Sequence, residues 1–142
     1  MSTPIPEFMQ AILLQGKGKP LTVGQIPVPR PGRGQVLVRM AAAPINPSDL
    51  GFLKGGYGFQ KPFPVVPGFE GSGIVVGAGP GVLPRLFVGR RVVCSAQQGG
   101  SWAEYLVASA SQCFPLDRKL SLEQGATLIT ALPQKPWPAR WA

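Results

Sequence analysis

Residues 64–79 read PVVPGFEGSGIVVGAG, and this stretch decides the fold class. Ile and Val fill positions 74–76, and Gly recurs at positions 71, 73 and 77. A short β-branched run bounded by Gly and Pro is typical of a buried strand. Gly on alternate positions of such a strand lets another backbone or a ligand approach closely. We therefore predict a buried strand at residues 71–77.

Similar short apolar runs, each followed by a turn signal, occur on both sides of this stretch. The Pro-rich segment 27–34 cannot lie inside a sheet and is expected to be an extended loop. Helical signals occur only around residues 46–54 and at 121–129, where Ser121 is placed to cap the helix. Many short strands with Gly and Pro turns indicate a mainly β barrel or sandwich. The further expected strands are 10–14, 21–25, 36–43, 91–95, 105–108 and 112–114.

The amino-acid composition and the net charge exclude several classes of protein. The 142 residues fit one domain, and 44% hydrophobic residues exclude a disordered chain. The net charge of +8 raises the question of nucleic acid, but the basic residues are scattered and no nucleic-acid-binding motif appears. No apolar run approaches the ~20 residues that a membrane span needs. We expect a cytoplasmic protein that binds neither nucleic acid nor membrane.

The two cysteines, Cys94 and Cys113, have no metal-ligand spacing, and the chain contains no histidine. A disulfide between them is one interpretation, and two buried free thiols is the other. We expect free thiols, as is usual for a cytosolic protein.

Both ends of the chain differ from the rest. Residues 1–8 (MSTPIPEF) are interpreted as an expression leader, and the domain is expected to start at Met9. Residues 130–142 (TALPQKPWPARWA) carry three prolines and two tryptophans and are interpreted as a frameshifted or vector-encoded tail without stable order.

Three places carry candidate chemistry. Asn46 lies in a polar turn, where its amide can donate and accept, and Tyr57 has a phenol able to donate to a developing oxyanion. Spacing alone favours a plainer interpretation, a helix-capping turn at 46–49 and a loop anchor at Tyr57. Glu70 fits a salt bridge to an arginine and a role in a site equally well. The Gly-rich run 77–81 suggests a dinucleotide loop, but Pro80 and Pro84 exclude the helix that must follow, so we reject it.

Several motifs in a fixed order resemble a known family. They are INPSDL (45–50), GGYG (55–58), the stretch 64–79, VGRRV (88–92) and GSWAEY (100–105). Together they resemble the N-terminal GroES-like catalytic domain of medium-chain dehydrogenases/reductases, over about residues 10–129. The resemblance implies a partly open β-barrel with one or two short helices. It also implies a Rossmann domain after residue 129, which is missing here.

The resemblance also implies the chemistry. Zinc alcohol dehydrogenases of this superfamily have Cys where this chain has Asn46 and His where it has Phe69, so no zinc is expected. That leaves the zinc-free branch, and the Asn-Pro-Ser-Asp turn with Gly-x-Tyr-Gly is most similar to its enoyl thioester reductases. In that branch the residue matching Tyr57 assists hydride transfer beside the substrate carbonyl. The residue matching Asn46 lies near substrate and nicotinamide, which implies both a catalytic and a cofactor-binding role.

We therefore predict a truncated NADPH-dependent oxidoreductase that reduces the activated C=C bond of an enoyl thioester or enone. NADPH is expected only in the full-length enzyme, and the chain alone is expected to be inactive. The preference for NADPH over NADH remains open. Two alternatives remain: a quinone oxidoreductase fragment, and a non-catalytic GroES-like module that self-associates through an exposed apolar face.

Overall fold

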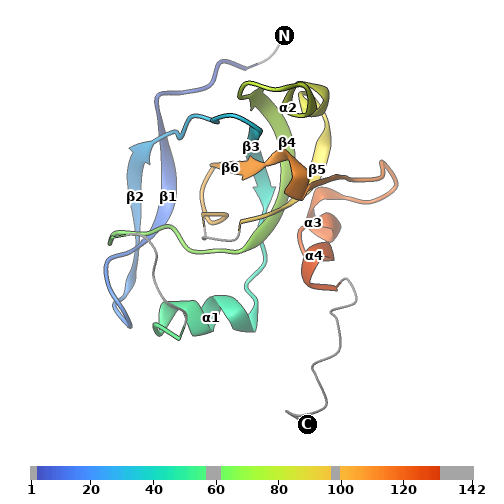
Figure 1. The fold of residues 1–142 in the computed structure, drawn as a ribbon. Coiled ribbons are helices and arrows are strands. Elements are labelled where there is room, and N and C mark those ends of the chain that lie inside the picture. Colours follow the sequence, from blue (N-terminus) through green and yellow to red (C-terminus); the bar gives the residue numbers. More distant parts are fainter. Residues whose placement is uncertain (1–2, 57–61, 97–99, 132–142) are drawn as a thin grey trace, which may run out of the picture.

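The computed structural model describes residues 3–56, 62–96 and 100–131, and its strands form two antiparallel sheets (Figure 1). The larger sheet has the order β6-β3-β4-β5-β7, and the smaller one pairs β1 with β2. The strands are β1 (Phe8–Leu14), β2 (Leu21–Pro27), β3 (Gln35–Ala42), β4 (Glu70–Ala78), β5 (Arg91–Ser95), β6 (Tyr105–Ser109) and β7 (Cys113–Pro115). The mainly β architecture predicted from the sequence is confirmed, and each predicted strand overlaps an observed one.

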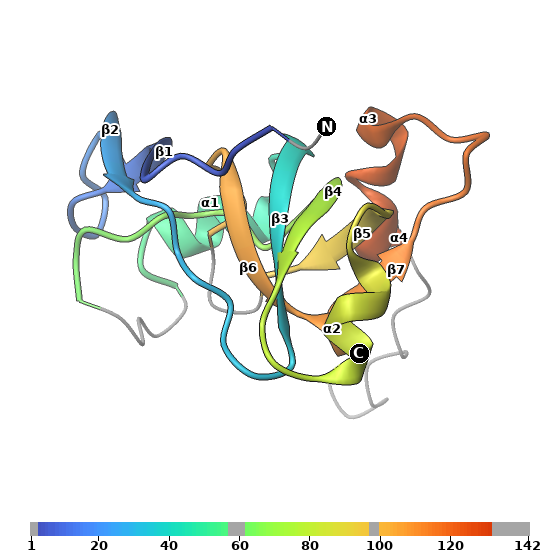
Figure 2. The same cartoon turned by 90° about the horizontal axis from the view of Figure 1, so that it is seen from above.

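The two sheets do not close into a barrel within the described residues. Figure 2 shows β1 and β2 at one end of the molecule and the larger sheet beside them. The connection between them runs through the segment before β6, because Ile12 N donates to Trp102 O (2.9 Å) and Glu104 N donates to Gln10 O (3.1 Å). The barrel is thus more open than the predicted one, and β1 begins at Phe8, one residue before the expected start of the domain.

The glycines of β4 allow a close approach between two backbones. A Cβ atom added to Gly73 would lie 2.1 Å from the carbonyl oxygen of Arg39 on the neighbouring strand β3. Gly73 pairs with Met40 at a point where the β3–β4 register is irregular. The sequence analysis expected these glycines to admit either another backbone or a ligand. At Gly73 it is the backbone of β3 that approaches.

The hydrophobic core lies on β3, β4 and β5, where Val36, Val38, Val75 and Val92 are fully buried. A second cluster of Leu14, Phe52 and Val65 packs beneath α1 (Pro47–Leu53). Burial of these apolar side chains stabilises the sheet and fixes the position of α1 against it.

A helix that the sequence analysis excluded is present. Helix α2 (Val82–Phe87) follows β4, although Pro80 and Pro84 were expected to prevent one. Pro84 lies in the first turn, where backbone N–H groups have no intrahelical acceptor, so its missing N–H is tolerated. The rejection of a dinucleotide fold at this point is nevertheless confirmed, because β4 and β5 on either side of α2 are antiparallel.

The C-terminal helical region is two short helices, α3 (Leu122–Gly125) and α4 (Leu128–Ala131), where one helix at 121–129 was predicted. The predicted cap is confirmed, because Gln124 N donates to Ser121 Oγ (3.0 Å) and Ser121 N donates to Gln124 Oε1 (2.8 Å). Across the described part of the chain, no helix has the length and apolar character that crossing a membrane requires.

Candidate functional site

The candidate site is built where α1 begins. Pro47 is the first helical residue, a position that suits proline. The buried carboxylate of Asp49 accepts a hydrogen bond at Oδ2 from the backbone N–H of Asn46 (2.7 Å). The helix-capping interpretation of this turn is therefore confirmed for Asp49. The side chain of Asn46 takes part in the same capping box through the backbone N–H of Asp49, and its Nδ2 is directed toward β4.

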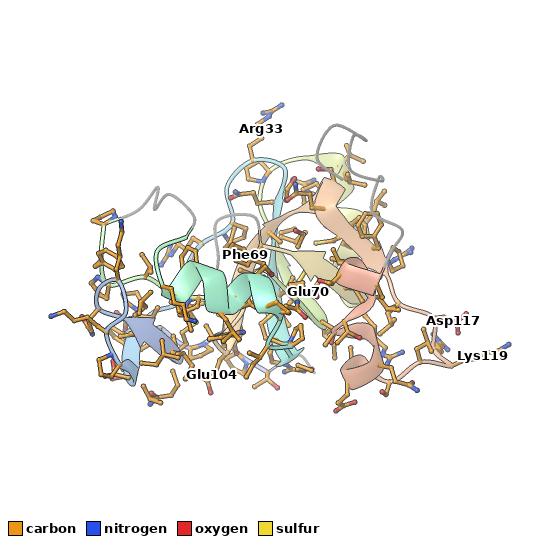
Figure 3. The ribbon with its side chains drawn as sticks, turned by 90° about the horizontal axis from the view of Figure 1, so that it is seen from below. Arg33, Phe69, Glu70, Glu104, Asp117 and Lys119 are labelled. Carbon is orange, nitrogen blue, oxygen red and sulfur yellow. The ribbon has the colours of Figure 1, made fainter. Side chains whose placement is uncertain are left out.

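Glu70, the first residue of β4, meets that side chain. Its own side chain is only 2% exposed, and its Oε1 accepts from Asn46 Nδ2 at 2.7 Å. Thr130 in α4 adds two more donors, since its backbone N–H donates to Oε2 (3.0 Å) and its hydroxyl donates to Oε1. Figure 3 shows Glu70 between α1 and the C-terminal helices. The carboxylate thus joins three segments that are distant in sequence.

The partners of Glu70 decide between the two earlier interpretations of this residue. In the portion of the chain that the structure describes, the carboxylate contacts an amide and a threonine and no arginine. Hydrogen bonds from several donors satisfy a buried carboxylate without a cation nearby. Within the described residues Glu70 therefore forms no salt bridge, and its contact with Asn46 places it in the candidate site.

Thr130 is the site residue that sequence analysis missed. It was assigned to the tail at 130–142, yet its backbone and its hydroxyl both bind Glu70. The two residues are 60 positions apart, so no local spacing signals the contact.

Phe69 occupies the position at which zinc dehydrogenases carry histidine. Its ring packs edge-on against Phe52, with centroids 5.3 Å apart and an interplanar angle of 85°. Among the described residues, no group of three or more His, Cys, Asp or Glu side chains is arranged to hold a metal ion. Phe69 therefore acts in packing beneath α1, and the absence of zinc in the whole enzyme stays a prediction.

Tyr57 lies outside the described residues, so its predicted role stays a prediction. The structure describes the chain up to that point. After α1, Gly55 adopts a φ of +81°, and its N–H donates to Phe52 O (2.9 Å). Glycine adopts this left-handed backbone conformation without strain, so the helix ends here and the Gly-rich segment begins.

An apolar groove lies next to the segment that leads into α1, and Ile45, the residue before Asn46, is part of its lining. Its volume is about 540 Å³, and the indole of Trp102 is fixed at its wall by a hydrogen bond from Nε1 to Pro44 O (3.1 Å). Ser101 also lines it, with a buried hydroxyl that has no hydrogen-bond partner within residues 3–56, 62–96 and 100–131. A concave apolar surface with a few polar groups is the usual form of a small-molecule site. Its apolar lining includes Ile12, Leu21, Val23, Met40, Ile45 and Trp102.

The two cysteines are buried free thiols, as predicted. They lie opposite each other on β5 and β7. Burial raises the pKa of the Cys113 thiol to about 11. Burial raises the pKa of Cys94 further still, and the nearby Cys113 and Glu70 add to the shift. Both thiols are therefore protonated at neutral pH and are poor nucleophiles.

Comparison with known proteins places this geometry in a family. Residues 32–118 match the alcohol dehydrogenase GroES-like domain. A mitochondrial enoyl-acyl-carrier-protein reductase of Caenorhabditis elegans is 36% identical over 124 residues, which are 84% of this chain and 35% of that protein. The structure of a Mesorhizobium loti protein described as an NADPH:quinone reductase superposes with a TM-score of 0.81 at 39% identity, over 89% of this chain and 42% of that one. A quinone oxidoreductase of Coxiella burnetii gives a TM-score of 0.77 at 29% identity, over 84% of this chain and 40% of that one.

The chain therefore belongs to the GroES-like domain family of the medium-chain dehydrogenases/reductases. It spans less than half the length of these relatives. The fold and the family are thus established, and the activity of a whole enzyme is a matter for proposal.

Proposed function

We propose that the chain is the catalytic-domain part of an NADPH-dependent oxidoreductase that reduces the C=C bond of a 2-enoyl thioester. The observation that carries this proposal is the amide of Asn46 held by the buried carboxylate of Glu70, directly after Ile45 in the lining of an apolar groove. The likeness to a mitochondrial enoyl-acyl-carrier-protein reductase supports the substrate class. NADPH, when bound, supplies a hydride to the carbon β to the thioester.

The described residues set limits on how this chain takes part in cofactor binding. Every strand pair in the described part of the chain is antiparallel, so these residues form no βαβ unit for a dinucleotide. What they offer is the neutral amide of Asn46, which suits the uncharged carboxamide of a nicotinamide. Most of the binding energy for NADPH then comes from residues other than those described.

Two side chains have roles in this proposal. Tyr57 donates a hydrogen bond or a proton to the thioester oxygen as negative charge develops there. Asn46 orients the reacting groups. The absence of zinc follows from Asn46 and Phe69, which replace a thiolate and an imidazole. We place the enzyme in the cytoplasm.

The test is to join this chain to a cofactor-binding domain, taken from its own gene or from the nematode relative. NADPH oxidation is then followed with crotonyl-CoA and with a quinone. We expect turnover of crotonyl-CoA by the joined enzyme and none by the 142-residue chain. Tyr57→Phe should lower kcat/KM by about 100-fold, the usual contribution of a general acid. A joined enzyme that binds NADPH but reduces neither substrate, or full activity in Tyr57→Phe, would refute the proposal.

Quinone reduction is the second candidate, and the likeness to the Mesorhizobium loti protein favours it. The same assay separates the two candidates. An enoyl reductase oxidises NADPH with crotonyl-CoA but not with a thioester that lacks the C=C bond. A quinone reductase oxidises NADPH with the quinone and with neither thioester.

Self-association is a third candidate, supported by the exposed apolar side chains of α2. Val82 is 78% exposed and Leu86 is 61% exposed. Exposed apolar patches of this kind commonly mark an interface. We expect a dimer or larger assembly by light scattering, and Leu86→Lys should shift it toward monomer. A monodisperse wild-type monomer at high concentration would count against this candidate.

A further inference from the structure

We propose that Glu70 is a positioning residue that fixes the side-chain amide of Asn46, so that Asn46 offers its carbonyl oxygen to the ligand of the site. The orientation follows from contacts within this chain. Only the identity of the ligand rests on the proposed function.

The chemistry of the two side chains allows one orientation. An ionised carboxylate only accepts hydrogen bonds, and the amide has one face that donates and one oxygen that accepts. Asn46 Nδ2 lies 2.7 Å from Glu70 Oε1, the length of a charge-assisted hydrogen bond. Turning the amide over would place two acceptor oxygens at that distance inside a buried site. The carboxylate therefore determines which end of the Asn46 amide is nitrogen and which is oxygen, an assignment that atom positions alone leave open.

Thr130 reinforces this orientation. Its hydroxyl donates to the same Oε1 atom, and it lies 3.2 Å from Asn46 Nδ2. Asn46 Nδ2 therefore donates to both Glu70 Oε1 and Thr130 Oγ1. Among the described residues, Oδ1 of Asn46 faces only the backbone N–H of Asp49, in the capping box of α1, so one of its two lone pairs is left for a ligand. A ligand group that meets Oδ1 must therefore bring a donor, an N–H or an O–H.

This requirement separates the roles of two residues in the proposed enzyme. A thioester carbonyl has no donor, so Oδ1 cannot polarise it, and that task is left to Tyr57. The primary carboxamide of a nicotinamide does carry N–H donors. Asn46 held by Glu70 is therefore suited to orient the cofactor ring and not the substrate carbonyl.

The sequence makes a direct test possible, because Asn46 is the only asparagine in the chain. Asparagine-selective ¹⁵N labelling of the 142-residue protein gives one side-chain NH₂ group in an NMR spectrum. We expect at least one of its two protons to lie downfield of its position in a free asparagine side chain and to exchange with water at least about tenfold more slowly than there, as a charge-assisted hydrogen bond implies. Two protons with the chemical shifts and the exchange rates of a free asparagine side chain in the wild type would overturn the proposal.

Glu70→Gln keeps the volume but adds a donor, so the amide of Asn46 is no longer held in one orientation. The downfield shift and the slow exchange should then be lost while the backbone signals remain dispersed. Glu104→Gln is the matched control, because Glu104 is an exposed carboxylate that accepts from Gln10 N and does not touch Asn46. Retention of the Asn46 signature in Glu70→Gln would also overturn the proposal. Neither NMR readout depends on turnover, so a failed reductase assay leaves this inference intact. In the same way, loss of the NMR signature leaves the proposed reductase activity to be judged by its own assay.

Discussion

Gly73→Ala should destabilise the domain far more than the same change elsewhere in the same strand. The added methyl group would lie 2.1 Å from Arg39 O, 2.8 Å from Val38 Cγ1 and 2.9 Å from the Arg39 carbonyl carbon. Two of these atoms belong to the backbone of β3 and cannot turn aside. The strands must separate, which disturbs the β3–β4 pairing that carries the buried valines. Overpacking that side chains can absorb costs about 1–3 kcal/mol, so a clash with backbone is expected to cost at least about 3 kcal/mol.

Gly77→Ala is the matched control. Its methyl group would lie 3.5 Å from Leu37 Cβ and 3.7 Å from Ile5 Cδ1, which is ordinary van der Waals contact. This variant should be neutral, or stabilised by up to about 1 kcal/mol through the lower entropy of its unfolded chain. Urea unfolding followed by circular dichroism measures both variants. A difference of less than about 1 kcal/mol between them would refute the reasoning from backbone contact, given that an unhindered Gly→Ala change is worth about that much.

Two further results are expected of the folded domain. Because the folded-state pKa of Cys113 is raised from 9.0 to about 11, the unfolded thiol ionises first as the pH rises. The Cys113 thiol should contribute a loss of about 3 kcal/mol in the free energy of unfolding between pH 9 and 11. The Cys94 thiol, whose pKa is raised further, should add to the fall in the same range, so Cys113→Ala should make the profile less steep without flattening it. Leu14→Ala should lower the free energy of unfolding by about 2–5 kcal/mol, whereas Leu21→Ala at the groove should change it by much less.

The strands were predictable because their signals are local. A run such as 71–77 carries its β-branched residues and its bounding glycines within a few positions, and the structure places β4 there. Helix α2 was not predictable in this way. Two prolines near its start read as breakers, and only the position of Pro84 within the first turn makes it acceptable. Sequence alone does not state where a helix starts. It could not decide whether Pro84 lies in a first turn, which tolerates proline, or inside a helix, which does not.

The candidate site was predictable only in part. The resemblance to the family identified Asn46, and the local spacing identified Asp49 as the residue that caps α1. The partners of Glu70 were not predictable, because Asn46 is 24 positions away and Thr130 is 60 positions away. Contacts over such separations depend on how α1 and α4 pack against the sheet, which no short motif encodes.

The energetics of Glu70 support a role beyond stability. Removing a carboxylate from water costs several kcal/mol, and hydrogen bonds from an amide and a threonine offset this only in part. An apolar side chain of similar volume at this point would avoid that penalty, so the fold itself gains little from the charge. What the carboxylate provides is a single orientation for the amide of Asn46. A buried group that is costly for the fold and specific in what it orients is the pattern expected of a functional site. On this argument Glu70 belongs with Asn46 among the functional residues, although no spacing in the sequence pointed to their contact.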